Sequence, residues 1–219
     1  MEAPVDKVDL GRRLSGSRDP GRTRAAILAA ATQEFTAKGL NGARVDSIAK
    51  RAGANKRMIY HYFGGKEGLY VAVLEETYAA IRRAEIGLRF ADRDPVDGMR
   101  ELIRFTWHYF IEHPEFLSLL ATENLHHARH LKQSRRIREL HSPLIGMLSA
   151  LLRRGEKAGA FRAGVDPVQL YITIAALGFF YLSNRHTLST IFGRDLSAPA
   201  QLRARGEHII AVVLAYLGR

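Results

Sequence analysis

The 219-residue chain contains no cysteine, so it can form neither a disulfide bond nor a metal site with thiolate ligands. It also lacks a long hydrophobic run, because the most apolar segment, 170–182, is too short to span a bilayer. The N-terminal residues have no apolar core of the kind found in signal peptides. We therefore expect a cytoplasmic protein with no membrane partner.

Strand patterns and catalytic motifs are missing as well. No segment alternates polar and apolar residues for long enough to predict a β-strand. The sequence contains no phosphate-binding glycine loop, no nucleophile elbow and no plausible triad, since His141 and Ser142 are only neighbours in sequence. We therefore expect an all-α protein that is not an enzyme and needs no cofactor.

Acidic residues are outnumbered, with 22 Asp and Glu against 33 Lys and Arg, which gives a formal net charge of +11. Residues 1–66 hold 13 basic and 6 acidic residues, a net of +7, whereas residues 67–219 hold 20 and 16, a net of +4. The smaller part thus carries most of the excess, which indicates a local surface for a polyanion. A generally basic chain is the alternative interpretation.

Prolines indicate where the helices begin. Five of the seven stand at expected helix starts: Pro20, Pro95, Pro114, Pro167 and Pro199. Apolar spacing predicts about nine helices, at about 19–38, 46–52, 56–62, from 66, from 95, from 114, 140–157, 167–186 and 199–217.

Residues 46–63, DSIAKRAGANKRMIYHYF, have the spacing of a helix-turn-helix. Ala49 is small enough for two helices to cross there, and Gly53, four positions later, tolerates the positive φ of the turn. Ile59 then follows as the apolar anchor of the second helix, and Asn55 can cap its start. We therefore predict a DNA-reading element at this position.

The second helix presents polar and aromatic residues at the positions that would face the major groove. Arg57 could read guanine with its guanidinium fork, and Met58 could contact a thymine methyl group. The predicted DNA-binding residues are Arg44, Ser47, Asn55, Lys56, Arg57, Met58, Tyr60, His61, Tyr62 and Lys66. The alternatives are that the tyrosines only pack the small domain, or that the chain is a helical scaffold whose element no longer binds DNA.

The stretch AGANKRMIYHYFGGKEGLY resembles the signature of the TetR family of bacterial regulators, and the resemblance covers about residues 22–70. It implies a fold of nine or ten helices, dimerisation through the last two long helices and a ligand pocket in the C-terminal domain. One departure is Val45, where many members have a threonine. Valine has no side-chain donor for a phosphate, whereas the neighbouring Arg44 could still reach one.

The expected domains follow from these assignments. Residues 1–18 form a flexible basic arm, 19–65 the helix-turn-helix DNA-binding domain, and 66–219 the ligand-binding and dimerisation domain. Arginines of the arm and first helix could reach a minor groove or flanking phosphates, or the arm could be a solvated tail: Arg12, Arg13, Arg18, Arg22 and Arg24.

The predicted effector site is built from aromatic and polar residues of the C-terminal domain. The candidates are Trp107, Phe110, Glu123, Asn124, His127, Tyr171, Phe179 and Asn184. Plain core is the alternative for each aromatic residue, and surface contacts are the alternative for the polar ones. Segment 122–134 is similar to the RutR-like and nicotinate-repressor-like subgroup of the TetR family, which implies a polar heterocycle or an acid as the ligand.

The helix at 167–186 has two apolar faces and so needs two partners. One face carries Leu170, Ile174, Leu177, Gly178 and Tyr181, and the other carries Tyr171, Ala175, Phe179 and Leu182. The last helix has a stripe of Leu202, Gly206, Ile209, Val213 and Leu217. We expect a homodimer through these two helices, which predicts a pseudo-palindromic DNA operator.

The function expected from these features is a repressor that a small-molecule effector releases from DNA by tilting the helix that begins at Lys66. The spacing of Glu123, His126 and His130 leaves a metal-responsive regulator as an alternative. A helical metal-dependent enzyme is a further alternative, but it would need a second Glu-x-x-His motif, which the sequence lacks.

Overall fold

A computed structural model of the chain describes residues 19–88 and 93–218, and within these ranges it contains helices and no strand. The elements are α1 (Pro20–Gly42), α2 (Val45–Arg51), α3 (Lys56–Phe63), α4 (Lys66–Ile86), α5 (Pro95–Glu112), α6 (Pro114–Leu125), a 3-10 turn (Leu131–Gln133), α7 (Arg135–Lys157), α8 (Pro167–Ser183), α9 (Arg185–Phe192) and α10 (Pro199–Leu217). The predicted all-α class is confirmed.

All five helix starts marked by proline are confirmed. At three of them the preceding aspartate, Asp19, Asp94 or Asp166, accepts hydrogen bonds from backbone N–H groups of the first turn. Aspartate caps satisfy backbone donors that have no partner inside the helix. The local sequence therefore sets these boundaries.

Two other boundaries differ from the prediction. The helix expected at 167–186 ends at Ser183, because Asn184 leaves the α conformation and donates its side-chain N–H to the Phe180 carbonyl oxygen at 2.8 Å. The chain then continues as the separate helix α9. The helix expected from about residue 140 begins instead at Arg135, because Ser134 caps it by accepting from the Ile137 N–H at 3.2 Å.

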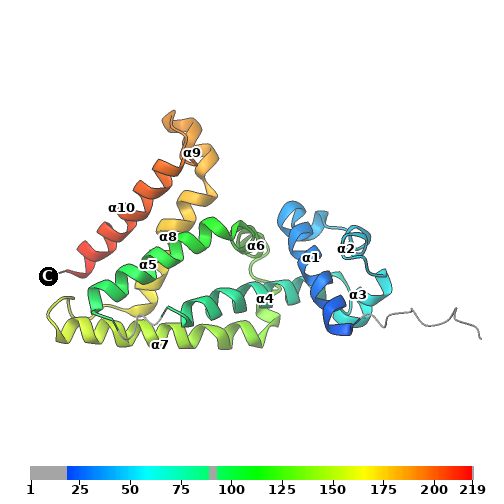
Figure 1. Cartoon of the computed structure of the whole chain (residues 1–219), viewed down its shortest axis with the longest axis horizontal. Helices are drawn as coiled ribbons and strands as arrows, with labels where there is room; N and C mark the ends of the chain where they lie inside the picture. The colour runs from blue at the N-terminus through cyan, green and yellow to red at the C-terminus, as the bar shows by residue number, and fades with distance from the viewer. Residues whose placement is uncertain (1–18, 89–92, 219) are drawn as a thin grey trace, which may run out of the picture.

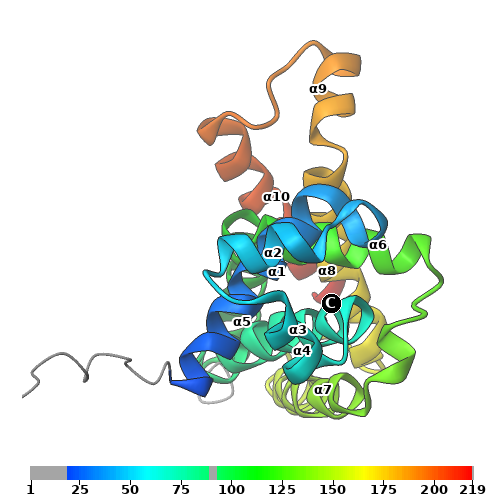
Figure 2. The ribbon, with the colours of Figure 1, turned by 90° about the vertical axis from the view of Figure 1, so that its right-hand side faces the viewer.

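Helices α1–α3 lie at one end of the molecule, around the beginning of α4 (Figure 1). Helix α4 runs from that group into the larger group of helices, where it packs along α7, while α5 packs against α8 and α10. Helix α6 packs against α1, so the two groups meet at a second place besides α4. Figure 2 shows α2 and α3 at the near end, in front of α4 and α7.

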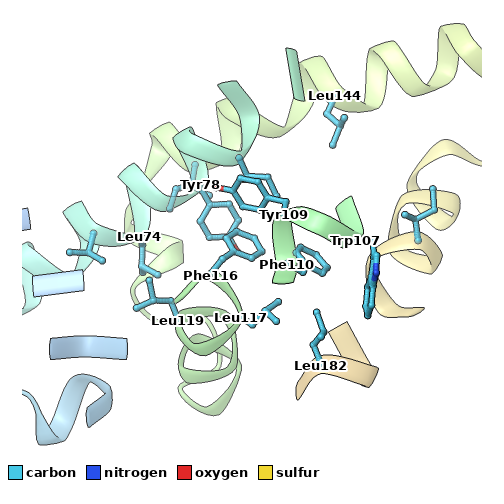
Figure 3. Packing of buried hydrophobic residues seen from close by; sticks show 14 of the residues in the cluster. Leu74, Tyr78, Trp107, Tyr109, Phe110, Phe116, Leu117, Leu119, Leu144 and Leu182 are labelled. Carbon is cyan, nitrogen blue, oxygen red and sulfur yellow. The ribbon is translucent and has the colours of Figure 1, made fainter. Parts of the chain in front are cut away.

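The apolar core continues from the small group of helices into the large one, as the buried side chains from Ile27 in α1 to Leu217 in α10 show. Aromatic rings fill its centre, where Tyr78, Tyr109 and Phe116 lie close together (Figure 3). In the described part of the chain, no helix combines the length and apolarity that a membrane span requires.

Candidate nucleic-acid interface and regulatory core

The turn between α2 and α3 has the geometry that its residue types predict. Gly53 has a φ of 59°, which glycine adopts without the steric cost that other residues incur. Ala49 and Ile59 are buried at the crossing of the two helices, and the Ala54 N–H donates to the Ala49 carbonyl at 3.0 Å. Asn55 caps α3 by accepting from the Arg57 N–H at 2.9 Å. This part of the chain is therefore a helix-turn-helix.

The outer face of α3 carries most of the predicted DNA-binding side chains. Lys56, Arg57 and His61 are exposed, and Tyr60 is 52% exposed although it is a large aromatic residue. Met58 and Tyr62 are half-buried on the same helix. On the neighbouring α2 side, Arg44 is exposed and Ser47 is half-buried. The structure thus brings these residues together on one short, capped helix and the element beside it.

Three of the predicted contact residues already have partners within the chain. Lys56 Nζ lies 2.9 Å from Asp46 Oδ1, and this hydrogen bond raises the pKa of Lys56. Lys66 Nζ donates to the Asn41 carbonyl oxygen at 3.2 Å, and the Asn55 carboxamide oxygen is used by the helix cap. Asn55 and Lys56 therefore fix the start of α3, and Lys66 fixes the start of α4 against the end of α1.

A buried glutamate that the sequence prediction missed joins α1 to the start of α2. Glu34 is 2% exposed, and its Oε1 accepts from Lys38 Nζ at 2.8 Å and from the Arg44 N–H at 3.4 Å. The hydrogen bond from Lys38 is the largest reason why the pKa of Glu34 is lowered. The i, i+4 spacing of Glu34 and Lys38 was the available signal, but nothing local indicated that the carboxylate would be buried.

Gly68 is a second missed residue, and it sets how closely α4 approaches the end of α3. A Cβ atom at this position would lie 1.9 Å from the Phe63 carbonyl oxygen. Only glycine therefore allows the observed packing. The contact depends on the tertiary arrangement, so the sequence offered no periodic signal for it.

Trp107, the central residue of the predicted effector site, packs into the core. Its indole N–H donates to the Leu202 carbonyl oxygen at 3.2 Å, which fixes the ring against α10. Gly178 and Gly206 lie against the ring from α8 and α10. Phe110 is also buried and stacks on Phe116 at 5.8 Å between ring centroids. These two aromatic residues thus join α5 to its neighbours.

The polar candidates near the end of α6 do not converge on one site. Glu123 is buried, and its carboxylate accepts from the His130 and Leu131 N–H groups and pairs with His130 Nδ1 at 2.9 Å. Asn124 and His127 are exposed instead. These three side chains lie apart in the protomer, because the chain leaves the α conformation after Leu125 and His127 has a φ of 54°.

The metal-site alternative also lacks support from the geometry. The rings of His126 and His130 are 6.3 Å apart, edge to face, while Glu123 is committed to His130 and to backbone donors. Within residues 19–88 and 93–218, no group of three potential ligands from His, Asp and Glu is placed to hold a metal ion.

The remaining effector candidates lie on α8 and at its end. Tyr171 and Phe179 are half-buried, and Asn184 caps the helix. The Tyr171 hydroxyl accepts from Arg82 Nη2 at 3.0 Å. Tyr171 is therefore the candidate that contacts a pair of charged residues inside the core.

This pair is Arg82 and Glu85 on α4, which are 3% and 2% exposed. Arg82 Nη1 lies 2.8 Å from Glu85 Oε2. Burial raises the pKa of Glu85 to about 7, against the opposing effect of the arginine, and burial also raises the pKa of the nearby Tyr78 to about 12. The sequence prediction missed this pair, because both residues resemble ordinary polar positions of an amphipathic helix.

The faces predicted for dimerisation are largely used inside the protomer. Of the α10 stripe, Ile209, Val213 and Leu217 are buried, and Gly206 lies against Trp107. The second predicted α8 face, Tyr171, Ala175, Phe179 and Leu182, is half-buried or buried. The exposed apolar stripe of α8 is instead Val168, Ile172 and Phe180, which are 45%, 51% and 60% exposed. None of these three residues belongs to either of the two predicted faces.

The predicted basic arm, with Arg12, Arg13 and Arg18, lies outside the described residues. Of the two arginines at the start of α1, Arg22 is exposed. Arg24 places its guanidinium carbon 5.3 Å from the centre of the Phe63 ring at the end of α3. Arg24 therefore stands beside the reading helix.

Comparison with known proteins agrees with this arrangement. Residues 27–73 match the family of bacterial regulatory proteins named tetR, and residues 95–213 match the tetracyclin repressor-like C-terminal domain. The transcriptional repressor NicS of Pseudomonas putida is 44% identical over 80% of this chain and 83% of its own length. The regulator RutR of Escherichia coli K12 is 28% identical over 90% and 92%. The crystal structure of SCO4942 from Streptomyces coelicolor has a TM-score of 0.67 and 26% identity, covering 90% of this chain and 99% of that one. The chain therefore belongs to the TetR family of DNA-binding transcriptional regulators.

Proposed function

We propose that this protein is a homodimeric repressor that reads a pseudo-palindromic operator with α3 and is released by a small-molecule effector. The observation that carries the proposal is the outer face of α3. This face carries exposed cationic and aromatic side chains. Asn55 caps the start of the helix, and contacts with neighbouring residues fix both of its ends. Such a helix suits base contacts from its first turns and phosphate contacts from its flanks.

Arg57 is the residue that we assign to base reading. It lies in the first turn of α3, it is exposed, and only its backbone N–H is used by the Asn55 cap. A guanidinium fork pairs with the two acceptors of guanine in the major groove. Arg44, Tyr60 and His61 are assigned to the phosphate backbone on either side.

Effector control requires a connection between the large group of helices and α1–α3. The Ser118 hydroxyl of α6 donates to the Thr36 carbonyl of α1 at 3.1 Å. On the other side, the Tyr70 ring of α4 contacts both Phe35 at 5.0 Å and His130 at 5.1 Å. A shift of α6 relative to α4 is therefore transmitted to α1 through packed contacts, and an effector that favours the shifted state releases DNA.

The test is binding of the full-length protein to DNA from its own upstream region, followed by fluorescence anisotropy. Arg57→Ala is expected to lower the affinity about tenfold or more, because one good base contact contributes about 1–3 kcal/mol. Arg153→Ala removes an exposed arginine from α7 and serves as the matched control, with affinity unchanged. Equal affinity of the Arg57 variant and the parent protein would remove α3 from the reading surface.

A further inference from the structure

Residues 126–138, which connect the end of α6 to the first turn of α7, contain basic side chains and neither Asp nor Glu. We call this stretch the basic segment. Its lysine and arginine residues, all of them exposed, are Arg129, Lys132, Arg135, Arg136 and Arg138. A run of like charges often forms only a solvated surface. Whether this one has a partner therefore depends on its conformation and on its place in the fold.

The turn at the start of the basic segment is strained and firmly held. His127 and Ala128 have φ values of 54° and 56°, which are unfavourable for residues other than glycine. The buried carboxylate of Glu123 holds the turn by accepting from the His130 and Leu131 N–H groups at 3.1 and 2.9 Å. Strained backbone persists where its surroundings fix it, and it is concentrated at functional sites. The basic segment is therefore a built surface and more than a connection between two helices.

The basic segment lies along the first half of α4, next to the DNA-reading helices. Arg129 Nη2 is 3.9 Å from Glu67 Oε1, and the Ser134 hydroxyl donates to Glu75 Oε1 at 2.7 Å. Figure 1 shows that α7 begins on the side of the molecule where α1–α3 lie and runs away from them. Because Glu67 is in the first turn of α4, Arg129 stands at the end of the basic segment that is nearest to α3.

A short path connects Arg129 to the face of α3 that we assign to DNA. Glu67, the partner of Arg129, follows Gly65 by two residues. A Cβ built at Gly65 would lie 3.7 Å from the ring of Tyr60, the exposed aromatic residue assigned to the phosphate backbone. A DNA strand carries a phosphate about every 3.4 Å along the duplex axis. The basic segment is thus placed to meet phosphates outside the base pairs that α3 reads.

Carboxylates neutralise only part of the positive charge. Three ion pairs are present: Arg129 with Glu67 at 3.9 Å, Arg135 with Glu139 at 2.7 Å and Arg136 with Glu75 at 3.6 Å. The side chains of these arginines are 51–87% exposed, and exposed ion pairs contribute at most about 1 kcal/mol. A phosphate can therefore replace such a carboxylate. Lys132 and Arg138 have no carboxylate at ion-pair distance among the described residues, so the surface keeps a net positive charge.

We infer that the basic segment binds DNA phosphates that flank the site read by α3, so that the core of this regulator contributes to operator binding directly. Arg129 and Lys132 are the contacting residues, and Arg129 exchanges Glu67 for a phosphate. These contacts carry no sequence information, because the phosphate oxygens are the same at every base pair. The inference rests on the proposed function, since it extends the DNA-binding surface of the same repressor.

The test compares the full-length protein with the double variant Arg129→Gln/Lys132→Gln by fluorescence anisotropy over a range of salt concentrations. The probes are the footprinted upstream duplex, with about one helical turn or 10 base pairs of flank on each side, and an unrelated duplex of the same length. Each phosphate contact contributes about 0.9 to the slope of log K against log salt, so losing two contacts in each protomer of a dimer should lower the slope by about 3–4. The affinity for both duplexes should fall by the same factor, at least about tenfold, which leaves their ratio unchanged.

Two controls separate phosphate binding from other effects. Arg153→Gln with Lys157→Gln removes two exposed cations from the far end of α7 and should keep the parental slope. Glu67→Gln tests whether Arg129 matters only as the partner of Glu67. In that case Glu67→Gln would weaken DNA binding as the Arg129 change does, whereas a phosphate-binding Arg129 is freed and the affinity is kept or raised. If the double variant loses thermal stability, Lys132→Gln alone should still lower the slope by about 2.

A parental slope in a double variant that unfolds at the parental temperature would overturn the inference. Weaker DNA binding by Glu67→Gln would overturn it too. So would a loss of affinity that persists when the duplex is trimmed to the base pairs whose substitution changes binding. A parent protein that binds both duplexes equally refutes the repressor, although the slopes still test the basic segment. Discrimination between the duplexes with unchanged slopes refutes the basic segment alone.

Discussion

At the scale of single residues, the buried polar groups of this regulator have strongly different roles. Glu34 has its carboxylate paired with Lys38, which lowers its pKa and ties α1 to α2. Glu123 is likewise satisfied by His130 and by backbone donors. Glu85 differs from both, because burial outweighs the attraction of Arg82 and raises its pKa to about 7. Glu85 is therefore expected to bind a proton near neutral pH.

Glu85 should make the stability of the protein depend on pH. In the unfolded chain the pKa of Glu85 is near 4.5, so the folded state binds the proton more tightly. The resulting contribution to the free energy of unfolding is fully present below pH 4.5. It is lost as the pH rises through about 7, and the difference between the two pKa values corresponds to about 3 kcal/mol. Glu85→Gln should therefore show a smaller fall in unfolding free energy between about pH 5 and pH 8.

The measurement is denaturant unfolding at one fixed protein concentration across that pH range. Glu112→Gln changes an exposed carboxyl group on α5 and is the matched control. Parallel pH profiles for Glu85→Gln and the parent protein would show that Glu85 does not titrate as described.

At the scale of elements, the close packing of α3 on α4 depends on one glycine. Gly68→Ala would place a Cβ 1.9 Å from the Phe63 carbonyl oxygen, so α3 must move. We expect destabilisation by about 1–3 kcal/mol and at least about tenfold weaker operator binding. The measurements are thermal unfolding and fluorescence anisotropy with upstream DNA.

Gly146→Ala on α7 is the control for this substitution. No heavy atom lies within 4 Å of a Cβ built there, and alanine favours the helix by up to about 1 kcal/mol over glycine. This variant should therefore be as stable as the parent protein or more so. If both glycine variants bind the operator with parental affinity, close packing at Gly68 does not position α3.

At the scale of elements, local features of the chain could be predicted from the sequence and long-range contacts could not. Features that depend on neighbouring residues were predictable, such as the Asn55 cap, the positive φ of Gly53 and the proline-marked helix starts. Features that depend on distant segments were not, such as the contact of Gly68 and the burial of Arg82. The partners of Trp107 could not be predicted either. An aromatic helix face predicts that the side chain is buried, but it does not show whether core residues or a ligand cover the ring.

At the scale of the whole molecule, α8 and α10 keep an apolar surface after the protomer has folded. Val168, Ile172 and Phe180 are exposed on α8, and Val212 and Tyr216 are exposed on α10. Figure 1 shows the end of α8, α9 and the start of α10 projecting from the rest of the helices. A second copy related by two-fold symmetry would cover such a surface and pair two reading helices.

Ile172→Glu together with Phe180→Glu should therefore produce a monomer of 24.5 kDa in sedimentation equilibrium. A charged group in an apolar interface costs several kcal/mol, which exceeds what most dimers can lose at micromolar concentration. The monomer should also bind the operator much more weakly, because only one reading helix remains. Leu125→Glu changes a residue that is 76% exposed at the end of α6 and should leave both properties unchanged. A dimeric double variant would place the interface elsewhere.

The polar contacts between α1 and the rest of the molecule have a consequence for recombination. Ser118 donates to the Thr36 carbonyl, and Lys66 donates to the Asn41 carbonyl, so both bonds end on backbone oxygens of α1. Backbone acceptors are present whatever the side chains of α1 are. We therefore expect these two bonds to survive substitutions in α1, so a chimera that receives another α1–α3 segment would keep both of them and would need a compatible residue only where Phe35 packs on Tyr70.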